Sequence, residues 1–184
     1  LRQENVDVAL ICDALPRVIC RAISITGGWQ HGAAPTPAFD EDVYDQAFKL
    51  AKSESDKKKI IGIDVLAQLG FDPRIGQKKT IELYFELLEN KQSEKVLFAL
   101  FYGISHNNEN LTKKQVSKLI EFKDSKNNDV RYSLVSALSG IENSIAIETL
   151  IELSEDKFSS IRNWATFGIG TLSDENNERI INAL

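Results

Sequence analysis

The sequence predicts an all-α solenoid of about four to five stacked helix pairs. The first observation is an apolar helical segment that occurs four times, with offsets of 35, 34 and 31 residues. A period of roughly 20 to 50 residues is typical of a solenoid, in which stacking of the units supplies the core. The second observation is that charged amphipathic segments alternate with the apolar ones. The third is that short polar joints connect the segments, while no β pattern competes.

The charged segments are predicted to be outer helices. Each carries apolar residues at helical spacing and charged residues elsewhere, as expected of a helix with one buried face. These segments are residues 42–53, 78–90, 112–123 and 144–156. The joints between successive helices are two to six residues long, so neighbouring helices are expected to be antiparallel.

The apolar segments are predicted to be inner helices, buried on two sides. They are residues 60–70, 96–105, 130–140 and 161–172. Their common apolar register is Ile61, Val96, Val130 and Ile161, then Val65, Leu100, Leu134 and Ala165, then Leu69, Ile104, Leu138 and Ile169. Small residues mark the places where neighbouring helices are expected to come close, at Ala99, Gly103, Ala137 and Gly168.

Polar residues predict where several helices begin and end. Thr112 with Gln115 fits a capping box, in which each side chain satisfies a free backbone amide. Asn128 and Asp129 are the expected caps of the helix that follows them, and Ser144 is the expected cap of the last outer helix. Left-handed residues that close a helix are expected just past two inner helices, at Gly70 and Gly140.

Residues 1–40 are predicted to form an N-terminal helical cap with an irregular Gly/Pro loop, and residues 41–184 to form the repeats. Residues 26–39 contain paired glycines and two prolines without a helical period, so they are expected to be a loop. Trp29 in this loop is a candidate anchor for a partner, and packing of the loop against the first repeat is the equal alternative. Because the sequence begins at Leu1 and contains no methionine, we expect further residues upstream.

Composition and motifs exclude several classes of function. The formal net charge of −5 over 184 residues disfavours a nucleic-acid partner, which usually requires a basic surface. Two histidines and no metal-ligand spacing leave no expected catalytic residue, metal site or cofactor. No apolar run is long enough to span a membrane. Cys12 and Cys20 are expected to be reduced thiols, which suits the cytoplasm.

Residues 156–172 resemble the HEAT repeat, and residues 129–140 resemble it nearly as well. In that family an outer helix ends at an Asp, and the inner helix opens with a Val/Ile–Arg pair. Asp156 and the pairs that contain Arg131 and Arg162 occupy these positions. The resemblance implies that Asp156, Arg131 and Arg162 contribute to a structural ladder between stacked repeats.

The resemblance extends over roughly residues 41–184 and implies a right-handed α-α superhelix with a concave wall of inner helices. Such a wall is used in the family mostly to hold proteins. Two repeats depart from the pattern, because Gly62 and Leu97 stand where the family has the arginine. The ladder is therefore expected to be weaker in these two repeats.

Two aligned columns on the inner helices are candidate binding residues. Phe98, Tyr132 and Asn163 share one position, and Tyr102 and Phe167 share the position four residues later. Aromatic side chains with polar tips are enriched at protein contacts. With Arg162, the candidate set is Tyr102, Tyr132, Asn163, Arg162, Phe98 and Phe167. The alternative is that Phe98, Phe167 and Trp164 fill the core between the helix layers.

The sequence therefore predicts a non-enzymatic scaffold or regulatory adaptor that binds a protein or peptide on its concave face. We expect a bacterial, cytoplasmic protein that is a monomer or a weak dimer. The alternative is an enzyme on the same scaffold, since some HEAT-like proteins are alkylpurine DNA glycosylases and others are bilin lyases. A glycosylase would need a basic groove, and the lysine clusters of this chain fall mostly on predicted outer helices.

Overall fold

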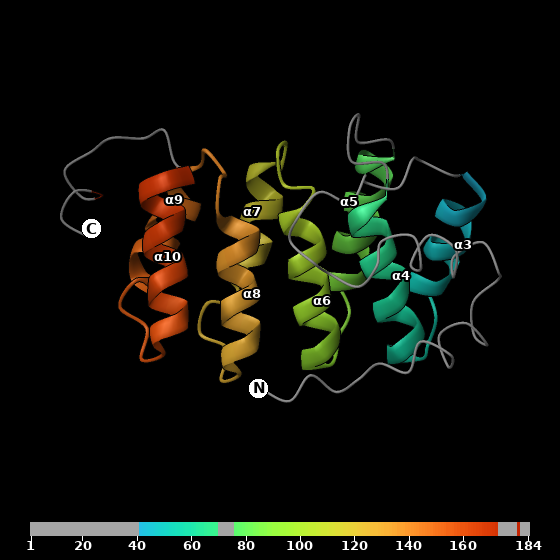
Figure 1. The fold of residues 1–184 in the computed structure, drawn as a ribbon, viewed down its shortest axis with the longest axis horizontal. Helices are drawn as coiled ribbons and strands as arrows, with labels where there is room; N and C mark the ends of the chain where they lie inside the picture. The colour runs from blue at the N-terminus through green and yellow to red at the C-terminus, as the bar shows by residue number, and fades with distance from the viewer. Residues whose placement is uncertain (1–40, 70–75, 173–179, 181–184) are drawn as a thin grey trace, which may run out of the picture. The chain divides into compact units, whose positions relative to one another are not determined.

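A computed structural model of the chain describes residues 41–69, 76–172 and 180 (Figure 1). Within these residues there are eight helices, labelled as in Figure 1, and no strand. The helices are α3 (Glu41–Ala51), α4 (Asp56–Gln68), α5 (Gln77–Leu88), α6 (Glu94–Ser105), α7 (Lys113–Ile120), α8 (Asn128–Leu138), α9 (Ser144–Leu153) and α10 (Ser159–Leu172). The all-α prediction is correct, and each helix corresponds to one predicted segment.

Several expectations fall outside the described residues. These are the N-terminal cap, the loop 26–39, the two cysteines and Gly70. The proposed division between a cap at 1–40 and repeats at 41–184 therefore stays a prediction. The chain separates into two compact units, residues 1–80 and 81–184, so α5 begins in the first unit and continues into the second.

In the first unit, α4 packs directly on the backbone of α3. A Cβ atom at Gly62 would lie 2.3 Å from the Ala51 nitrogen and 2.5 Å from the Ala47 carbonyl oxygen, so only glycine allows this approach. The Tyr44 hydroxyl donates to the Gly76 carbonyl oxygen at 3.3 Å and shares a hydrogen bond with Thr80 at 3.3 Å. These bonds connect α3 to the start of α5.

The predicted register of the α4 segment is wrong at Ile61 and Val65 and correct at Leu69, which is buried. Ile61 and Val65 are partly exposed, whereas Ile63 and Leu66 are buried. The aliphatic residues of α4 are spread around its circumference, so their periodicity does not single out one face of the helix. The close approach at Gly62 instead decides which side of α4 faces α3.

In the second unit, α6, α8 and α10 lie side by side in one layer, and α7 and α9 form a second layer behind them (Figure 1). The predicted register is correct in these three inner helices. Val96, Val130 and Ile161 are buried, and so are the residues four and eight positions later. Small residues allow the close packing: a Cβ at Gly103 would lie 2.9 Å from the Tyr84 ring, and one at Gly168 would lie 2.5 Å from the Ser139 hydroxyl.

The helix starts confirm one predicted cap and correct two. Thr112 and Gln115 form the predicted capping box. Helix α8, however, is capped by Asn127, whose side-chain Oδ1 accepts from the backbone amides of Asp129 and Val130, and α9 is capped by Asn143. Each helix begins one or two residues before its first apolar position, so the apolar pattern places the cap too late. Gly140 has the expected left-handed backbone, with φ of 78°.

Candidate protein-binding face

The exposed side of α6 carries three rings in successive turns. Phe98 and Tyr102 are stacked, with ring centroids 6.4 Å apart and an interplanar angle of 3°. The Tyr102 ring meets His106 edge to face, with centroids 4.9 Å apart. The i, i+4 spacing places these side chains on one side of the helix. Together they form a continuous aromatic strip along α6.

The neighbouring helices α8 and α10 carry a second group of rings. Trp164 of α10 packs edge to face against Tyr132 of α8, with ring centroids 6.3 Å apart. It also packs edge to face against Phe167, one turn further along α10, at 5.5 Å. Trp164 therefore joins the aromatic side chains of two inner helices.

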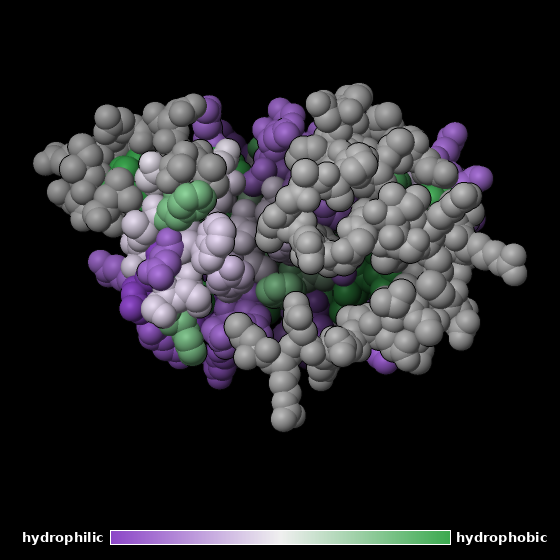
Figure 2. Space-filling model, in the orientation of Figure 1, coloured by the Kyte–Doolittle hydropathy of each residue, from purple (hydrophilic) through white to green (hydrophobic). Residues whose placement is uncertain are grey.

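Three of these rings are exposed to solvent, whereas Tyr102, His106 and Tyr132 are half-buried. The exposed fraction is 38% for Phe98, 46% for Trp164 and 45% for Phe167. The alternative that these three residues fill the core is therefore wrong, because aliphatic residues such as Leu100 and Leu134 already occupy the space between the layers. We call Phe98, Tyr102, His106, Tyr132, Trp164 and Phe167 the aromatic face. Figure 2 shows mainly near-neutral and apolar colours over α8 and α10, with hydrophilic residues around them.

The three helices that carry the aromatic face have no charged residue beyond their first turns. In α6 the charged residues are Glu94 and Lys95, in α8 they are Asp129 and Arg131, and in α10 there is Arg162 alone. All five lie among the first four residues of their helices. An edge-to-face aromatic surface without charges favours contacts with uncharged groups.

Polar groups on this face are available for binding. Within the described part of the chain, no hydrogen bond involves the Tyr132 hydroxyl, the Trp164 indole N–H or the Asn163 side-chain amide. Arg162 differs, because its Nη1 atom donates to the Asp156 carbonyl oxygen at 2.7 Å. Five of the six candidate residues therefore lie on the solvent-facing side of α6, α8 and α10. The sixth, Arg162, is directed toward the joint that precedes α10.

Sequence reasoning missed two members of the face. The sequence pattern indicates Trp164 only as a possible core residue and indicates no role for His106. The signal for Trp164 was its position three residues before Phe167, which places both on one side of a helix. Trp29, the other aromatic candidate, lies outside the described residues.

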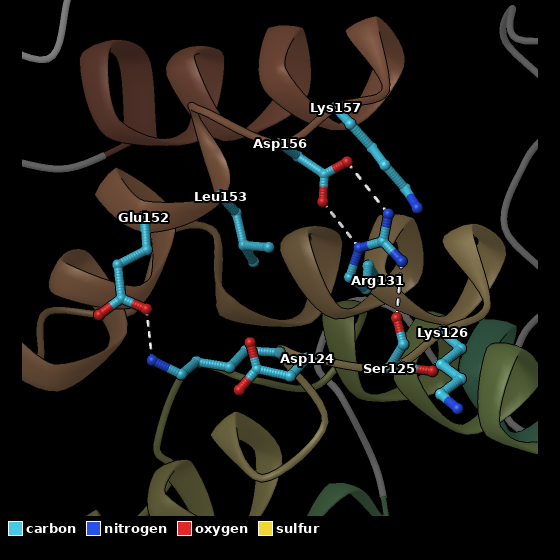
Figure 3. Close-up of a pocket in the computed structure, with 9 residues that line it drawn as sticks. Asp124, Ser125, Lys126, Arg131, Glu152, Leu153, Asp156 and Lys157 are labelled. Carbon is cyan, nitrogen blue, oxygen red and sulfur yellow. Dashed lines mark hydrogen bonds and ion pairs between the residues drawn. The ribbon is translucent and has the colours of Figure 1, made fainter.

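Arg131 and Asp156 form a buried ion pair near the starts of α8 and α10 (Figure 3). The Arg131 Nε and Nη2 atoms donate to the two carboxylate oxygens at 2.7 and 3.0 Å, and Nη1 donates to the Ser125 carbonyl oxygen at 2.6 Å. Only 7% and 9% of the two side chains is exposed. The guanidinium hydrogen bonds lower the pKa of Asp156, and the Phe158 N–H acts in the same direction. This pair connects α8 to the joint before α10.

An open pocket of about 410 Å³ surrounds this ion pair. Its lining residues are Lys123, Asp124, Ser125, Lys126, Arg131, Glu152, Leu153, Asp156 and Lys157. Lys123 forms an ion pair with Glu152, and Arg131 is neutralised by Asp156 (Figure 3). The pocket therefore presents little net charge and no pair of groups arranged for catalysis.

Neither a metal cluster nor a membrane-spanning helix occurs in the described ranges. No three His, Cys, Asp or Glu side chains of residues 41–69, 76–172 and 180 are grouped so that they could hold a metal ion. Among the same residues, every helix is too short or too polar to cross a bilayer.

Known proteins resemble this chain in structure rather than in sequence. No protein-family model matches the chain, and no curated protein matches it. A designed armadillo repeat protein superposes with a TM-score of 0.58 and 18% identity over 77% of this chain and 71% of that protein. A related design, in complex with the peptide (KR)4, gives the same TM-score and identity over 77% and 70% of the two chains.

A computationally designed armadillo repeat protein for modular peptide recognition covers 96% of this chain and 86% of its own, with a TM-score of 0.58 and 15% identity. Identities this low carry information about the fold alone. Together with the alternating layers of α6 to α10, these similarities show that the chain has the armadillo/HEAT-like helical-repeat fold.

Proposed function

We propose that this protein is a non-enzymatic scaffold that binds a segment of another protein on the aromatic face. The observation that carries the proposal is the presence of two packed groups of rings, one on α6 and one on the neighbouring helices α8 and α10, in which Phe98, Trp164 and Phe167 are exposed. Contiguous exposed apolar groups are uncommon on isolated proteins and mark interaction sites. Trp and Tyr residues are also the commonest energetic centres of protein interfaces.

The structural neighbours support the same class of function. One is described as bound to a peptide and another as made for modular peptide recognition. We propose the corresponding role for this chain, with Phe98, Tyr102, Tyr132, Asn163 and Phe167 as contacts together with Trp164. Arg162 is a weaker candidate, because its guanidinium already donates to a backbone carbonyl.

We further propose that the repeats are of the HEAT type. A HEAT repeat contains two helices, whereas an armadillo repeat contains three. In the second unit, helices from the two layers alternate along the chain, and the Arg131–Asp156 pair connects consecutive helix pairs. In this proposal the ion pair has a structural role and takes no part in binding.

The DNA glycosylase alternative receives no support from the aromatic face. A protein that binds DNA must neutralise phosphates with Lys or Arg side chains. The exposed positions beyond the first turns of α6, α8 and α10 carry none. No observation on the described residues favours a bilin lyase.

A pull-down with the full chain tests the proposed function. The bait is compared with a Phe98→Ala/Trp164→Ala variant and with Ile145→Ala, which removes an exposed apolar side chain from the outer helix α9. We expect a specific protein to be retained by the parent chain and by Ile145→Ala, with or without nuclease. Its affinity for the double variant should fall at least about tenfold, the effect of losing an interface anchor.

The interpretation requires that all three baits be folded, which circular dichroism checks. Equal recovery of the partner by the double variant would show that binding does not use the aromatic face. Nuclease-sensitive recovery would instead indicate a nucleic-acid partner.

A further inference from the structure

We propose that the segment bound by the aromatic face is uncharged, rich in proline and in the polyproline II conformation. This inference depends on the proposed function and specifies the chemistry of the partner. It follows from three properties of the face: its lack of charge, the kind of polar groups that it offers, and the spacing of its helices.

The charge pattern of the face favours an uncharged ligand. Beyond the first turns, the exposed side chains of α6, α8 and α10 are aromatic rings, hydroxyls and one amide. A charged ligand side chain seated among these rings would lose its hydration without gaining an ionic partner. The complementary segment is therefore composed of uncharged residues.

The polar groups of the face suit a ligand that offers carbonyl oxygens. The Trp164 indole N–H is a donor only, and the Tyr132 hydroxyl and Asn163 amide can also donate. A polyproline II segment makes no internal hydrogen bonds, so its carbonyl oxygens are free to accept. Its prolines lack an N–H, so burial against the rings leaves few backbone donors unsatisfied. Proline-rich segments bind aromatic-lined grooves in several unrelated domains for these reasons.

The described helices are poorly suited to a ligand in a β-strand. A strand ligand pairs with the free edge of a sheet, and residues 41–69 and 76–172 contain no sheet. The backbone groups within a helix already bond to one another. A ligand on this face must therefore be held by side chains, as a polyproline II segment is.

The rise per turn of a polyproline II segment also matches the distance between the axes of neighbouring inner helices. Polyproline II has three residues per turn and advances about 3.1 Å per residue, or about 9 Å per turn. Directly packed helices have axes about 8 to 10 Å apart, and α6 packs on α8, which packs on α10. A segment lying across these helices would present every third residue to a successive helix.

Synthetic peptides test the inference directly. The probe is fluorescein-labelled (Leu-Pro-Pro)5, and the comparison probes are (Leu-Ser-Gly)5, which keeps the leucine spacing without the stiffness, (Lys-Arg)4 and an uncharged Leu/Gln 15-residue helix. Binding is measured by anisotropy with the full chain. The sequence contains two tryptophans, Trp29 and Trp164. In a Trp29→Phe background Trp164 is the one that remains, so a change in tryptophan emission reports contact at Trp164.

We expect (Leu-Pro-Pro)5 to bind at least about tenfold more tightly than each comparison probe and to shift the Trp164 emission. Trp164→Ala and, on a different helix, Phe98→Ala should each weaken this binding at least about fivefold, whereas Ile145→Ala should not. Both face residues are exposed, and urea unfolding of each variant verifies that the fold is retained.

Two results would overturn the inference while leaving the proposed function intact. One is a comparison probe that binds as tightly as (Leu-Pro-Pro)5 and depends on Trp164. The other is no binding of (Leu-Pro-Pro)5 by a chain that still retains its protein partner through Phe98 and Trp164. Failure of both the peptide and the partner to depend on these residues would overturn the inference and the proposed function together.

Discussion

Two carboxylates in the described part of the chain have opposite surroundings. Asp156 accepts hydrogen bonds from Arg131 and from the Phe158 amide, and its pKa is lowered. Asp64 of α4 makes no hydrogen bond or ion pair within the described residues, and burial raises its pKa to about 7. The ionised form of Asp156 therefore stabilises the folded state, whereas the ionised form of Asp64 destabilises it.

We expect Asp156→Asn to destabilise the protein by about 3 kcal/mol near pH 7, because Arg131 would remain buried without a charged partner. Asparagine keeps an oxygen that can accept from the Phe158 amide. Because the folded pKa of Asp156 lies below the unfolded value of about 3.9, its contribution is complete above about pH 5. It is lost as the pH falls through the folded pKa. Urea unfolding of both proteins from pH 3 to 7 measures this difference.

The double variant Arg131→Met/Asp156→Asn is the control for this prediction. It removes both charges, so we expect it to be more stable than Asp156→Asn alone. Additive destabilisation by the two substitutions would mean that the residues do not act as a pair.

We expect Asp64→Asn to become progressively more stabilising as the pH rises from about 4 to 7. Over this range the folded state keeps a proton on Asp64 that the unfolded chain has released, so the parent protein loses stability as the pH rises. The loss is at most about 1.4 kcal/mol per pH unit. Urea unfolding at several pH values tests this, and a difference between parent and variant that does not change with pH would contradict it.

At the scale of helices, polar caps and small residues fix where each helix begins and how closely it packs. The Asn127 side chain accepts from the Asp129 and Val130 amides at 2.8 and 3.2 Å. It also donates to Glu94 at 2.6 Å, which connects the starts of α6 and α8. Asn128, the residue next to it, makes only a 3.4 Å contact with Asp129.

We expect Asn127→Ala to lower the free energy of unfolding by about 1 to 2 kcal/mol, because two amides at the start of α8 lose their acceptor. The matched control is Asn128→Ala, which changes the same residue type one position later. It should change stability by less than about 0.5 kcal/mol. Thermal or urea denaturation of the two variants measures the contrast, and a larger loss for Asn128→Ala than for Asn127→Ala would contradict the assignment of Asn127 as the cap.

At the scale of the whole molecule, the described charged residues of the second unit lie mainly outside the aromatic face. The outer helices α7 and α9 carry their charged residues along their length, for example Lys118 and Glu152. The exposed side of the inner helices of the second unit is uncharged beyond the first turns. In the described part of the second unit, charged side chains therefore run along the outer helices, and exposed rings run along the inner helices.

We expect binding of the protein partner to be nearly independent of salt. Interactions between exposed charges are screened over about 10 Å at 0.1 M ionic strength, whereas contacts between rings and apolar groups are not. The dissociation constant should change less than about threefold between 0.05 and 0.5 M NaCl. A steep weakening with salt would show that charged residues outside the aromatic face carry the binding.

The sequence by itself determined that the chain is a stack of helix pairs, because a repeated apolar register requires neighbours to cover it. It also placed Phe98, Tyr102, Tyr132, Asn163 and Phe167 on one side of their helices, because helical spacing fixes the direction of side chains. Their role in binding stays a prediction.

Only the tertiary structure decided which of these residues are exposed and which helix faces are buried. Trp164 is accessible because aliphatic residues from other helices already fill the core. The register of α4 follows from the contact of Gly62 with the backbone of α3, and the Arg131–Asp156 pair joins residues 25 positions apart. These features depend on contacts between segments distant in sequence, which the periodicity of a single helix does not contain.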